Sequence, residues 1–243
     1  ILGQRDRVYE PFYFAMDECN LRRYTMKKAC AVIGILLLGT ALFAREATVS
    51  IGAGKNWKEK MASQCAVWLE DANGNYVRTL YVTQRASKRN WIVGPKAGRP
   101  ESLPVWYHAA HYESAKGAPG NSDVDAVTAA TPKGGVVFTA EIGDGAYVIK
   151  AEFNTSFDYN DFYTKKNSGV NGQPSVVYEA KISADASGEI ELSLAGTGSE
   201  DGSDGTIYAD VSKLTTAKTI VDKIIIKNKR GITVNIPLKT CSY

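Results

Sequence analysis

Histidine and cysteine are scarce in this sequence. Its 243 residues include 2 histidines and 4 cysteines. So few cysteines exclude a dense disulfide scaffold, and the two histidines leave little material for a hydrolytic triad. An excess of one charge is also missing, because 29 basic residues stand against 26 acidic ones. The basic residues are scattered among acids, which excludes the positive footprint of a nucleic-acid-binding protein.

Several catalytic motifs are absent as well. The sequence contains no phosphate-binding loop, no dinucleotide fingerprint, no Cys-x-x-Cys pair and no Gly-x-Ser-x-Gly elbow. What is present is a chain that is 44% hydrophobic and 10% aromatic, which is enough to bury a core. We therefore expect a globular protein that is non-catalytic.

The longest apolar run, residues 29–38, is too short to span a bilayer. It follows Lys27 and Lys28, and the small residue Ala44 suits the position before a cleavage site. This pattern predicts a signal peptide over residues 26–44, with residues 1–25 as a non-native upstream extension. The alternative is an uncleaved N-terminal anchor. We expect a periplasmic or otherwise exported protein with no membrane span after cleavage.

If the protein is exported, the two cysteines that remain after cleavage enter an oxidising compartment. Cys65 and Cys241 can pair in an oxidising compartment, where they would close a very long loop. The alternative is two separate buried thiols, and the sequence leaves both open.

Short runs rich in β-branched and aromatic residues, separated by turn residues, follow one another over residues 45–243. They predict eight strands in four hairpins, and hence a mainly β fold: one antiparallel, immunoglobulin-like β-sandwich domain with long loops. The expected strand pairs are 64–70 with 76–83, 135–142 with 146–153, 174–183 with 189–195, and 222–227 with 231–236.

Two stretches break the strand pattern and predict short helices. Residues 100–112 could form one, with Ser102 as its N-cap and Pro104 in its first turn. Residues 212–221 could form the other. Long loops are expected at 84–100, 113–134, 155–173 and 196–210, and loops of this length are commonly functional.

Six segments in order resemble an uncharacterised family of predicted periplasmic proteins that is named only as a domain of unknown function. The resemblance covers nearly all of residues 45–243. It implies export and a β-sandwich similar to immunoglobulin-like domains of the flagellar hook-cap type. In bacterial gene sets such proteins accompany flavin transferases and membrane redox proteins, so the resemblance implies a partner of that kind. The segments are VWLEDANGNYVRTLYVT (67–83), RPESLPVW (99–106), DAVTAATPKGG (125–135), GAYVIKAEFNTSFDYN (145–160), GQPSVVYEAKI (172–182) and DGSDGTIYADVSKLTTA, which ends at residue 217.

The segment from Asp125 to Thr131 resembles the acceptor motif of exported flavoproteins, in which a transferase esterifies the last threonine with flavin mononucleotide (FMN). Thr131 would be the acceptor, with Asp125 and Thr128 at the other polar motif positions. Ala129 replaces the usual glycine of the motif, which puts its backbone conformation in doubt. The alternative interpretation is an ordinary loop that enters the next strand.

Two clusters could hold a metal ion. Glu200, Asp201 and Asp204 lie in a Gly-rich turn that could bind calcium, although their spacing does not match the full calcium-loop pattern. The alternative is a solvated acidic turn. His108 and His111 would share one helical face and could bind zinc with a third ligand, or simply be an exposed or packed pair.

Aromatic residues are frequent outside the expected strands, where they suit stacking on flat ligands or anchoring an interface. We therefore predict an exported binding or accessory module, associated with flavin-dependent redox systems, whose working surface is one end of the sandwich. That end would be built from loops 99–112, 121–134 and 155–173. The alternative is an electron carrier with FMN on Thr131. The loop aromatics are Tyr107, Tyr112, Phe157, Tyr159, Phe162 and Tyr163.

Overall fold

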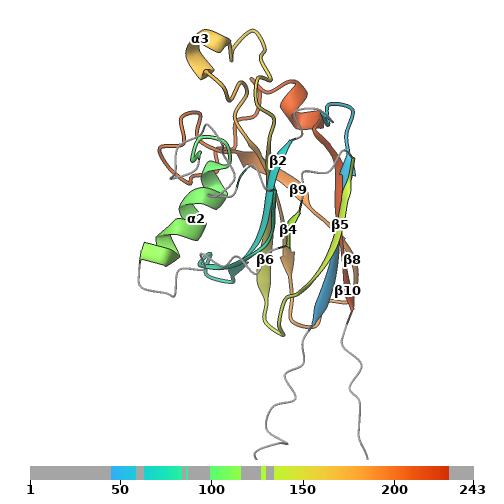
Figure 1. Ribbon diagram of the computed structural model, residues 1–243. Coiled ribbons are helices and arrows are strands. Elements are labelled where there is room, and N and C mark those ends of the chain that lie inside the picture. The colour runs from blue at the N-terminus through green and yellow to red at the C-terminus, as the bar shows by residue number, and fades with distance from the viewer. Residues whose placement is uncertain are drawn as a thin grey trace, which may run out of the picture. The chain divides into compact units, whose positions relative to one another are not determined.

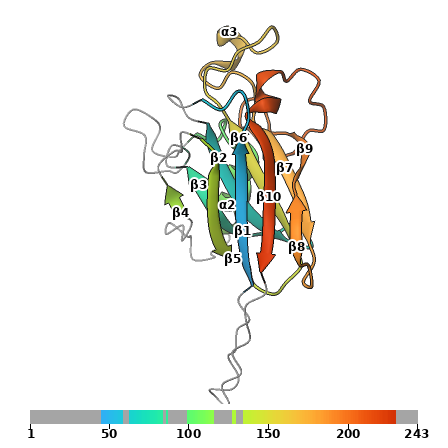
Figure 2. The ribbon, with the colours of Figure 1, turned by 90° about the vertical axis from the view of Figure 1, so that its right-hand side faces the viewer.

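Two β-sheets form the framework of the residues that the structure, a computed structural model, describes (Figures 1 and 2). Those residues are 45–58, 63–83, 86, 99–115, 127–129 and 134–229, without the side chains of 111–115, 127–129 and 229. The strands are β1 (Glu46–Ala53), β2 (Gln64–Asp71), β3 (Tyr76–Thr83), β4 (Val127–Ala129), β5 (Val136–Glu141), β6 (Tyr147–Asn154), β7 (Val176–Ile182), β8 (Gly188–Glu191), β9 (Ser193–Thr197) and β10 (Val221–Lys229).

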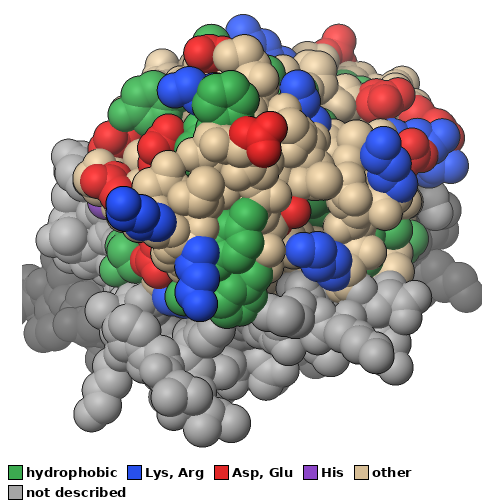
Figure 3. All heavy atoms as spheres, turned by 90° about the horizontal axis from the view of Figure 1, so that it is seen from above, with side chains coloured by type: hydrophobic (Ala, Val, Ile, Leu, Met, Phe, Trp, Pro, Cys, Tyr) green, Lys and Arg blue, Asp and Glu red, His purple; other side chains and the backbone are tan. Residues whose placement is uncertain are grey.

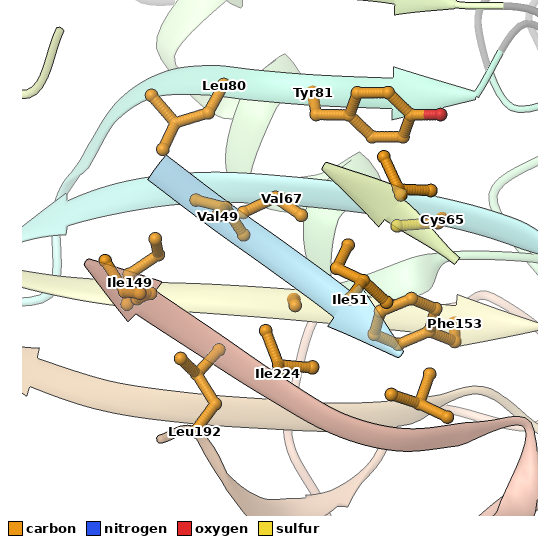
Figure 4. Close-up of a cluster of buried hydrophobic side chains, with 14 of the residues drawn as sticks. Val49, Ile51, Cys65, Val67, Leu80, Tyr81, Ile149, Phe153, Leu192 and Ile224 are labelled. Atoms are coloured by element: carbon orange, nitrogen blue, oxygen red, sulfur yellow. The ribbon is translucent and has the colours of Figure 1, made fainter. Parts of the chain in front are cut away.

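One sheet has the strand order β5-β1-β10-β8 and the other the order β4-β3-β2-β6-β7-β9. All pairs are antiparallel except β3 with β4 at the edge of the second sheet. The inner faces pack against each other through alternate residues, as β1 illustrates with its buried Ala47, Val49 and Ile51. Figure 4 shows Val49 and Ile51 among the apolar side chains between the sheets. The predicted mainly β sandwich is therefore confirmed.

A helix covers the outer face of the six-stranded sheet. Helix α2 (Pro104–Ala115) packs Val105 and Trp106 onto Ala66 and Trp68 of β2, which form a second hydrophobic cluster (Figure 1). The indole nitrogen of Trp106 donates a hydrogen bond to Oγ1 of Thr79 at 2.8 Å, so its polar group is satisfied in the buried contact. The helix thus adds a third layer to the sandwich.

The predicted first hairpin is confirmed, and its turn has a clear local cause. β2 and β3 pair across residues 71–75, where the carboxylate of Asp71 accepts bonds from the backbone N–H groups of Asn73 and Asn75. Gly74 has the positive φ of 83° that this turn requires.

The second predicted hairpin is wrong, and the third is confirmed only in part: β7 pairs with residues 193–197 but not with residues 189–191, because the chain crosses between the sheets on either side of β8. β5 pairs with β1 and β6 pairs with β2, so the turn after residue 142 links the two layers. The expected strand 189–195 divides at the buried Leu192 into β8, which pairs with β10, and β9, which pairs with β7. Each crossing keeps apolar residues on the inner face of both layers.

The first strand of the fourth predicted hairpin is confirmed as β10, but its predicted pairing is excluded at residues 225–228. β10 already pairs with β1 on one edge and with β8 on the other at residues 225–228, so no edge is free there. Residues 231–236 lie outside the described residues, as do the predicted extension 1–25 and signal peptide 26–44. The helix expected at 212–221 is only the 3-10 turn η1 (Thr216–Thr219). No helix within the described ranges is long and apolar enough to cross a membrane.

Arg45, the residue before β1, anchors the start of that strand. Its side chain is buried, and its Nη1 donates to the carbonyl oxygens of Ser183 at 2.6 Å and Ala184 at 3.1 Å. Its Nη2 donates to the carbonyl oxygen of Gly145 at 2.8 Å. One guanidinium therefore holds together β1 and the two turns that cross between the sheets.

We predict that Arg45→Ala lowers the free energy of unfolding by about 3 kcal/mol, because three carbonyl oxygens in the crossing turns lose a charged donor. Denaturant unfolding measures this change. Arg78→Ala, at a half-buried arginine of β3, is the matched control and should cost less than about 1 kcal/mol. Equal costs for the two variants would show that Arg45 does not hold the crossing turns.

Candidate functional site

Three loops meet at the end of the sandwich where β6 ends and β7 begins. We call the surface formed by residues 54–58, 155–173 and 212–219 the apical surface; it includes α3 (Lys165–Ser168) and η1 (Figures 1 and 2). The side chain of Asn56 donates to the carbonyl oxygen of Thr216 at 3.3 Å, and that of Asn160 donates to the carbonyl oxygen of Lys213 at 2.9 Å. These contacts join the three loops into one surface.

A buried polar network supports this surface from below. Oδ2 of Asp158 accepts hydrogen bonds from Nε2 of Gln173 at 3.0 Å and from Oγ1 of Thr216 at 2.7 Å. Oε1 of Gln173 accepts from the backbone N–H of Thr215 at 2.7 Å. Gly172 permits the close approach, because a Cβ there would meet the carbonyl oxygen of Asp158 at 2.4 Å. These hydrogen bonds therefore hold the long loop 155–173 in one conformation.

Phe157 adopts an unusual backbone conformation on this loop. Its φ is 60°, the only positive value at a non-glycine residue in the described ranges, although its side chain is 45% exposed. Its N–H donates to the carbonyl oxygen of Val170 at 2.8 Å, and its ring meets the ring of Tyr159 edge to face at 6.5 Å. Backbone strain at an exposed aromatic residue is a pointer to function, because packing does not require it.

Phe162 is exposed for a different local reason. Oδ1 of Asn160 accepts the N–H groups of Phe162 at 2.9 Å and Tyr163 at 2.8 Å, which closes a tight turn and turns the Phe162 ring outward, 56% exposed. Val170 is 47% exposed on the same loop. Figure 3 looks onto this end and shows hydrophobic patches with both basic and acidic side chains beside them.

The six loop aromatics predicted from the sequence do not all gather here. Phe157, Tyr159 and Phe162 do. Tyr163 is instead buried, and its hydroxyl donates to Oε1 of Glu200 at 3.1 Å; burial raises the pKa of Tyr163 to about 12. Tyr107 packs at the edge of the cluster under α2, and the side chain of Tyr112 lies outside the described residues.

The carboxylates of the acidic turn are engaged locally. Asp201 accepts the N–H of Ser203 at 3.0 Å, and Asp204 accepts the N–H of Thr206 at 2.7 Å; these bonds lower the pKa of both carboxyl groups. Glu200 accepts the hydroxyl of Tyr163. Among the side chains that the structure describes, no group of three His, Cys, Asp or Glu residues could hold a metal ion.

The structure describes the side chain of His108 but not that of His111, so it does not show whether the two histidines lie together. Nε2 of His108 lies 2.8 Å from the carbonyl oxygen of Gly202, so this ring fastens α2 to the acidic turn. The side chain of His111 lies outside the described residues. The zinc interpretation therefore stays a prediction.

Parts of the FMN motif and of the cysteine pair also lie outside the described residues. Thr128 is in β4, where it is the register partner of Val82 in the parallel pair with β3. Asp125 and Thr131 are not described, so FMN attachment stays a prediction. Cys65 is buried in β2, and burial raises the pKa of its thiol. Cys241 is not described, so their pairing also stays a prediction.

Glu152 is an ionisable residue that the sequence analysis did not single out. It is fully buried on the outer face of β6 and caps α2: Oε2 accepts the N–H of Trp106 at 2.8 Å, and Oε1 accepts the N–H of Val105 at 3.3 Å. Oγ of Ser175 donates to Oε1 at 2.6 Å. Burial raises the pKa of Glu152 to about 7, although these three bonds oppose the shift. No local sequence signal marks it, because the capped N–H groups are 46 and 47 residues away.

This geometry corrects the predicted cap and excludes a simple catalytic role. Ser102 is not the cap, because its hydroxyl donates to the carbonyl oxygen of Arg99 at 3.1 Å. Glu152 takes that place, and its charge is favoured by the positive end of the helix. A shifted pKa can mark a catalytic acid. Here, however, the carboxylate is enclosed between helix and sheet, so we assign it a structural role.

Arg99 connects the start of α2 to the apical surface. Its Nη1 donates to Oγ of Ser156 at 3.2 Å, and its Nη2 donates to Oδ1 of Asn171. Its Nε also pairs with Glu101 at 3.0 Å. Through Arg99, residues 99–103 and loop 155–173 are held together, whereas residues 104–112 of the predicted working surface belong to α2. Most of the third predicted loop, 121–134, lies outside the described residues.

Residues 45–152 match the model of a family described as "Predicted periplasmic protein (DUF2271)". The matched range extends from β1 into β6 and includes α2 and Glu152, but not loop 155–173. The match confirms the predicted periplasmic or otherwise exported localisation. Searches of curated proteins and of solved structures found no match. The hook-cap type of immunoglobulin-like fold therefore stays a prediction.

We predict that stability falls as the pH rises from about 4.5 to 7 and levels off above that. The pKa of Glu152 is raised from 4.5 to about 7 in the folded state, so its stabilising contribution is fully present below pH 4.5 and has been lost once the pH reaches the folded pKa. The loss amounts to about 3 kcal/mol in the free energy of unfolding. Denaturant unfolding at several pH values measures it. Glu152→Gln should flatten the profile; an unchanged slope in this variant would contradict the assignment.

We also predict that Phe157→Asn does not destabilise the protein. Asparagine tolerates the positive φ, so the free energy of unfolding should equal that of the wild type or exceed it by up to about 1 kcal/mol. Phe162→Asn, at a phenylalanine whose φ is not positive, is the control and should give no gain. A loss of more than about 1 kcal/mol in Phe157→Asn would show that this ring serves packing.

Proposed function

We propose that this protein is a non-catalytic binding or accessory module of the periplasm and that it binds its partner through the apical surface. The observation that carries the proposal is Phe157, an exposed ring on a strained backbone held by the hydrogen bonds of its own loop. Such strain persists only where the surroundings impose it.

The exposed groups of this surface suit contact with a partner. Phe157 and Phe162 offer large apolar faces, and aromatic residues are frequent anchors of interfaces. The underlying loop is fixed by the Asp158 network, so little conformational freedom is lost when a partner binds. A rigid platform with outward rings therefore favours recognition.

The partner class stays part of this proposal. A flavin transferase or a membrane redox protein is the expectation from the resemblance. The electron-carrier alternative rests on Thr131, which lies outside the described residues, and nothing in the described residues favours it.

Site-specific photo-crosslinking in the periplasm tests the proposal. A photoreactive phenylalanine analogue at Phe162 should give crosslinked products. The same analogue at Val137, which is 71% exposed on the edge strand β5, is the control and should give few. Products that are absent at position 162, or equal at both positions, would contradict binding through the apical surface.

A further inference from the structure

We propose that the apical surface docks onto the surface of a bilayer that contains anionic phospholipid. This inference rests on the proposed function and names the partner of that same surface. Three observations lead to it: the charge of the three apical loops, the exposure of their apolar side chains, and the way these two kinds of side chain alternate along the chain.

The apical loops carry more positive charge than the whole protein. They contain six lysines and two aspartates, whereas the entire chain has a net charge of +3. One aspartate, Asp158, is buried and pairs with Lys58 at 3.9 Å, so the other five lysines and the exposed Asp161 set the outward charge of these loops. A surface of this kind attracts anions. The exposed lysines are Lys55, Lys58, Lys165, Lys166, Lys213 and Lys218.

Apolar side chains project from the same surface. Phe157, Phe162 and Val170 are 45%, 56% and 47% exposed, and all three belong to loop 155–173. Figure 1 shows that α3, in the middle of this loop, projects beyond the ends of the sheets. Apolar residues on a projecting loop can enter the boundary between headgroups and acyl chains.

The order of residues along the loop suits an interface. Lys165 and Lys166 of α3 lie between Phe162 and Val170 in the sequence, so an exposed apolar residue stands on either side of the two positive charges. Lysine next to phenylalanine is the combination that binds anionic membrane surfaces, because each lysine near the headgroups adds attraction. An acidic protein would satisfy the charges, but the projecting apolar side chains favour a lipid surface.

Docking through this end is independent of the predicted signal segment. The start of β1 and the end of β10, which are register partners at Glu46 and Lys229, lie at the opposite end of the sandwich (Figures 1 and 2). The experiment therefore uses the exported chain purified from the periplasm, so that an uncleaved apolar run at residues 29–38 is excluded by its mass.

Vesicle co-sedimentation tests the proposal, with vesicles of phosphatidylcholine alone and of phosphatidylcholine with phosphatidylglycerol in equal parts. We expect binding to the anionic vesicles, weakened by salt, and little to the neutral ones. Lys165→Glu with Lys166→Glu should weaken binding by at least about 25-fold, since each lysine contributes about fivefold. Both lysine side chains are exposed, so this variant should fold.

Two further variants make the result specific. Lys181→Glu with Lys227→Glu makes the same change of charge at exposed lysines of β7 and β10 and should leave binding within about threefold of wild type. Phe162→Ser should weaken binding even at high salt, because it removes an apolar contact. Equal losses in the two lysine variants, or equal binding to neutral vesicles, would overturn the proposal.

Failure of this inference can be told apart from failure of the proposed function. Absent vesicle binding together with a protein crosslinked at position 162 would overturn lipid docking and leave the apical surface as a binding site. Absent vesicle binding together with no crosslink at position 162 would overturn both.

Discussion

The buried carboxylate of Glu152 is the contact on which the arrangement of helix, sheet and apical loop depends. It accepts the first free N–H groups of α2 and thereby fixes the helix to β6 and, through Ser175, to the residue before β7. The chain that leads into α2 contains Arg99, whose guanidinium contacts Ser156 and Asn171. Through Arg99, the position of α2 therefore affects both ends of loop 155–173. A capping serine would bind the helix end without anchoring it to the sheet.

Buried apolar contacts and buried polar contacts lie in different parts of the molecule. Between the sheets, the core is built from side chains such as Val49, Ile51 and Phe153, as Figure 4 shows. At the apical end, buried polar groups replace them, and Asp158 and Gln173 find their partners in each other and in residues 215–216. Directional bonds of this kind fix a loop in one conformation, whereas apolar packing is less directional. This fixation allows Phe157 to keep a costly backbone angle while its ring is exposed.

The sequence predicted the parts of this protein that are encoded locally. The β2–β3 hairpin was foreseen because Asp71 and Gly74 define its turn within five residues. The turn around Gly143 and Gly145 has equally good local chemistry, yet it connects two sheets, because a turn motif does not state which strands it joins. Strand β1 was overlooked, although its alternation of buried and exposed residues is regular. From the sequence, Glu152 looks like an ordinary strand residue, because its hydrogen-bond partners are distant in the chain. Loop 155–173 was expected to form one end of the sandwich with residues 99–112 and 121–134, and the structure shows its contact with Arg99. The strain at Phe157, however, depends on backbone angles that no composition reveals.

Hydrogen exchange of the free, exported protein tests most directly whether the apical loop is a preformed surface. The amides of Phe157, Tyr163 and Gln173 donate within the loop, to Val170, to the side chain of Asn160 and to Asp158. The account predicts that they exchange far more slowly than an unstructured peptide, and that Glu152→Ala accelerates all three because α2 and Arg99 lose their anchor. Exchange at the rate of an unstructured chain in the wild type would contradict the account.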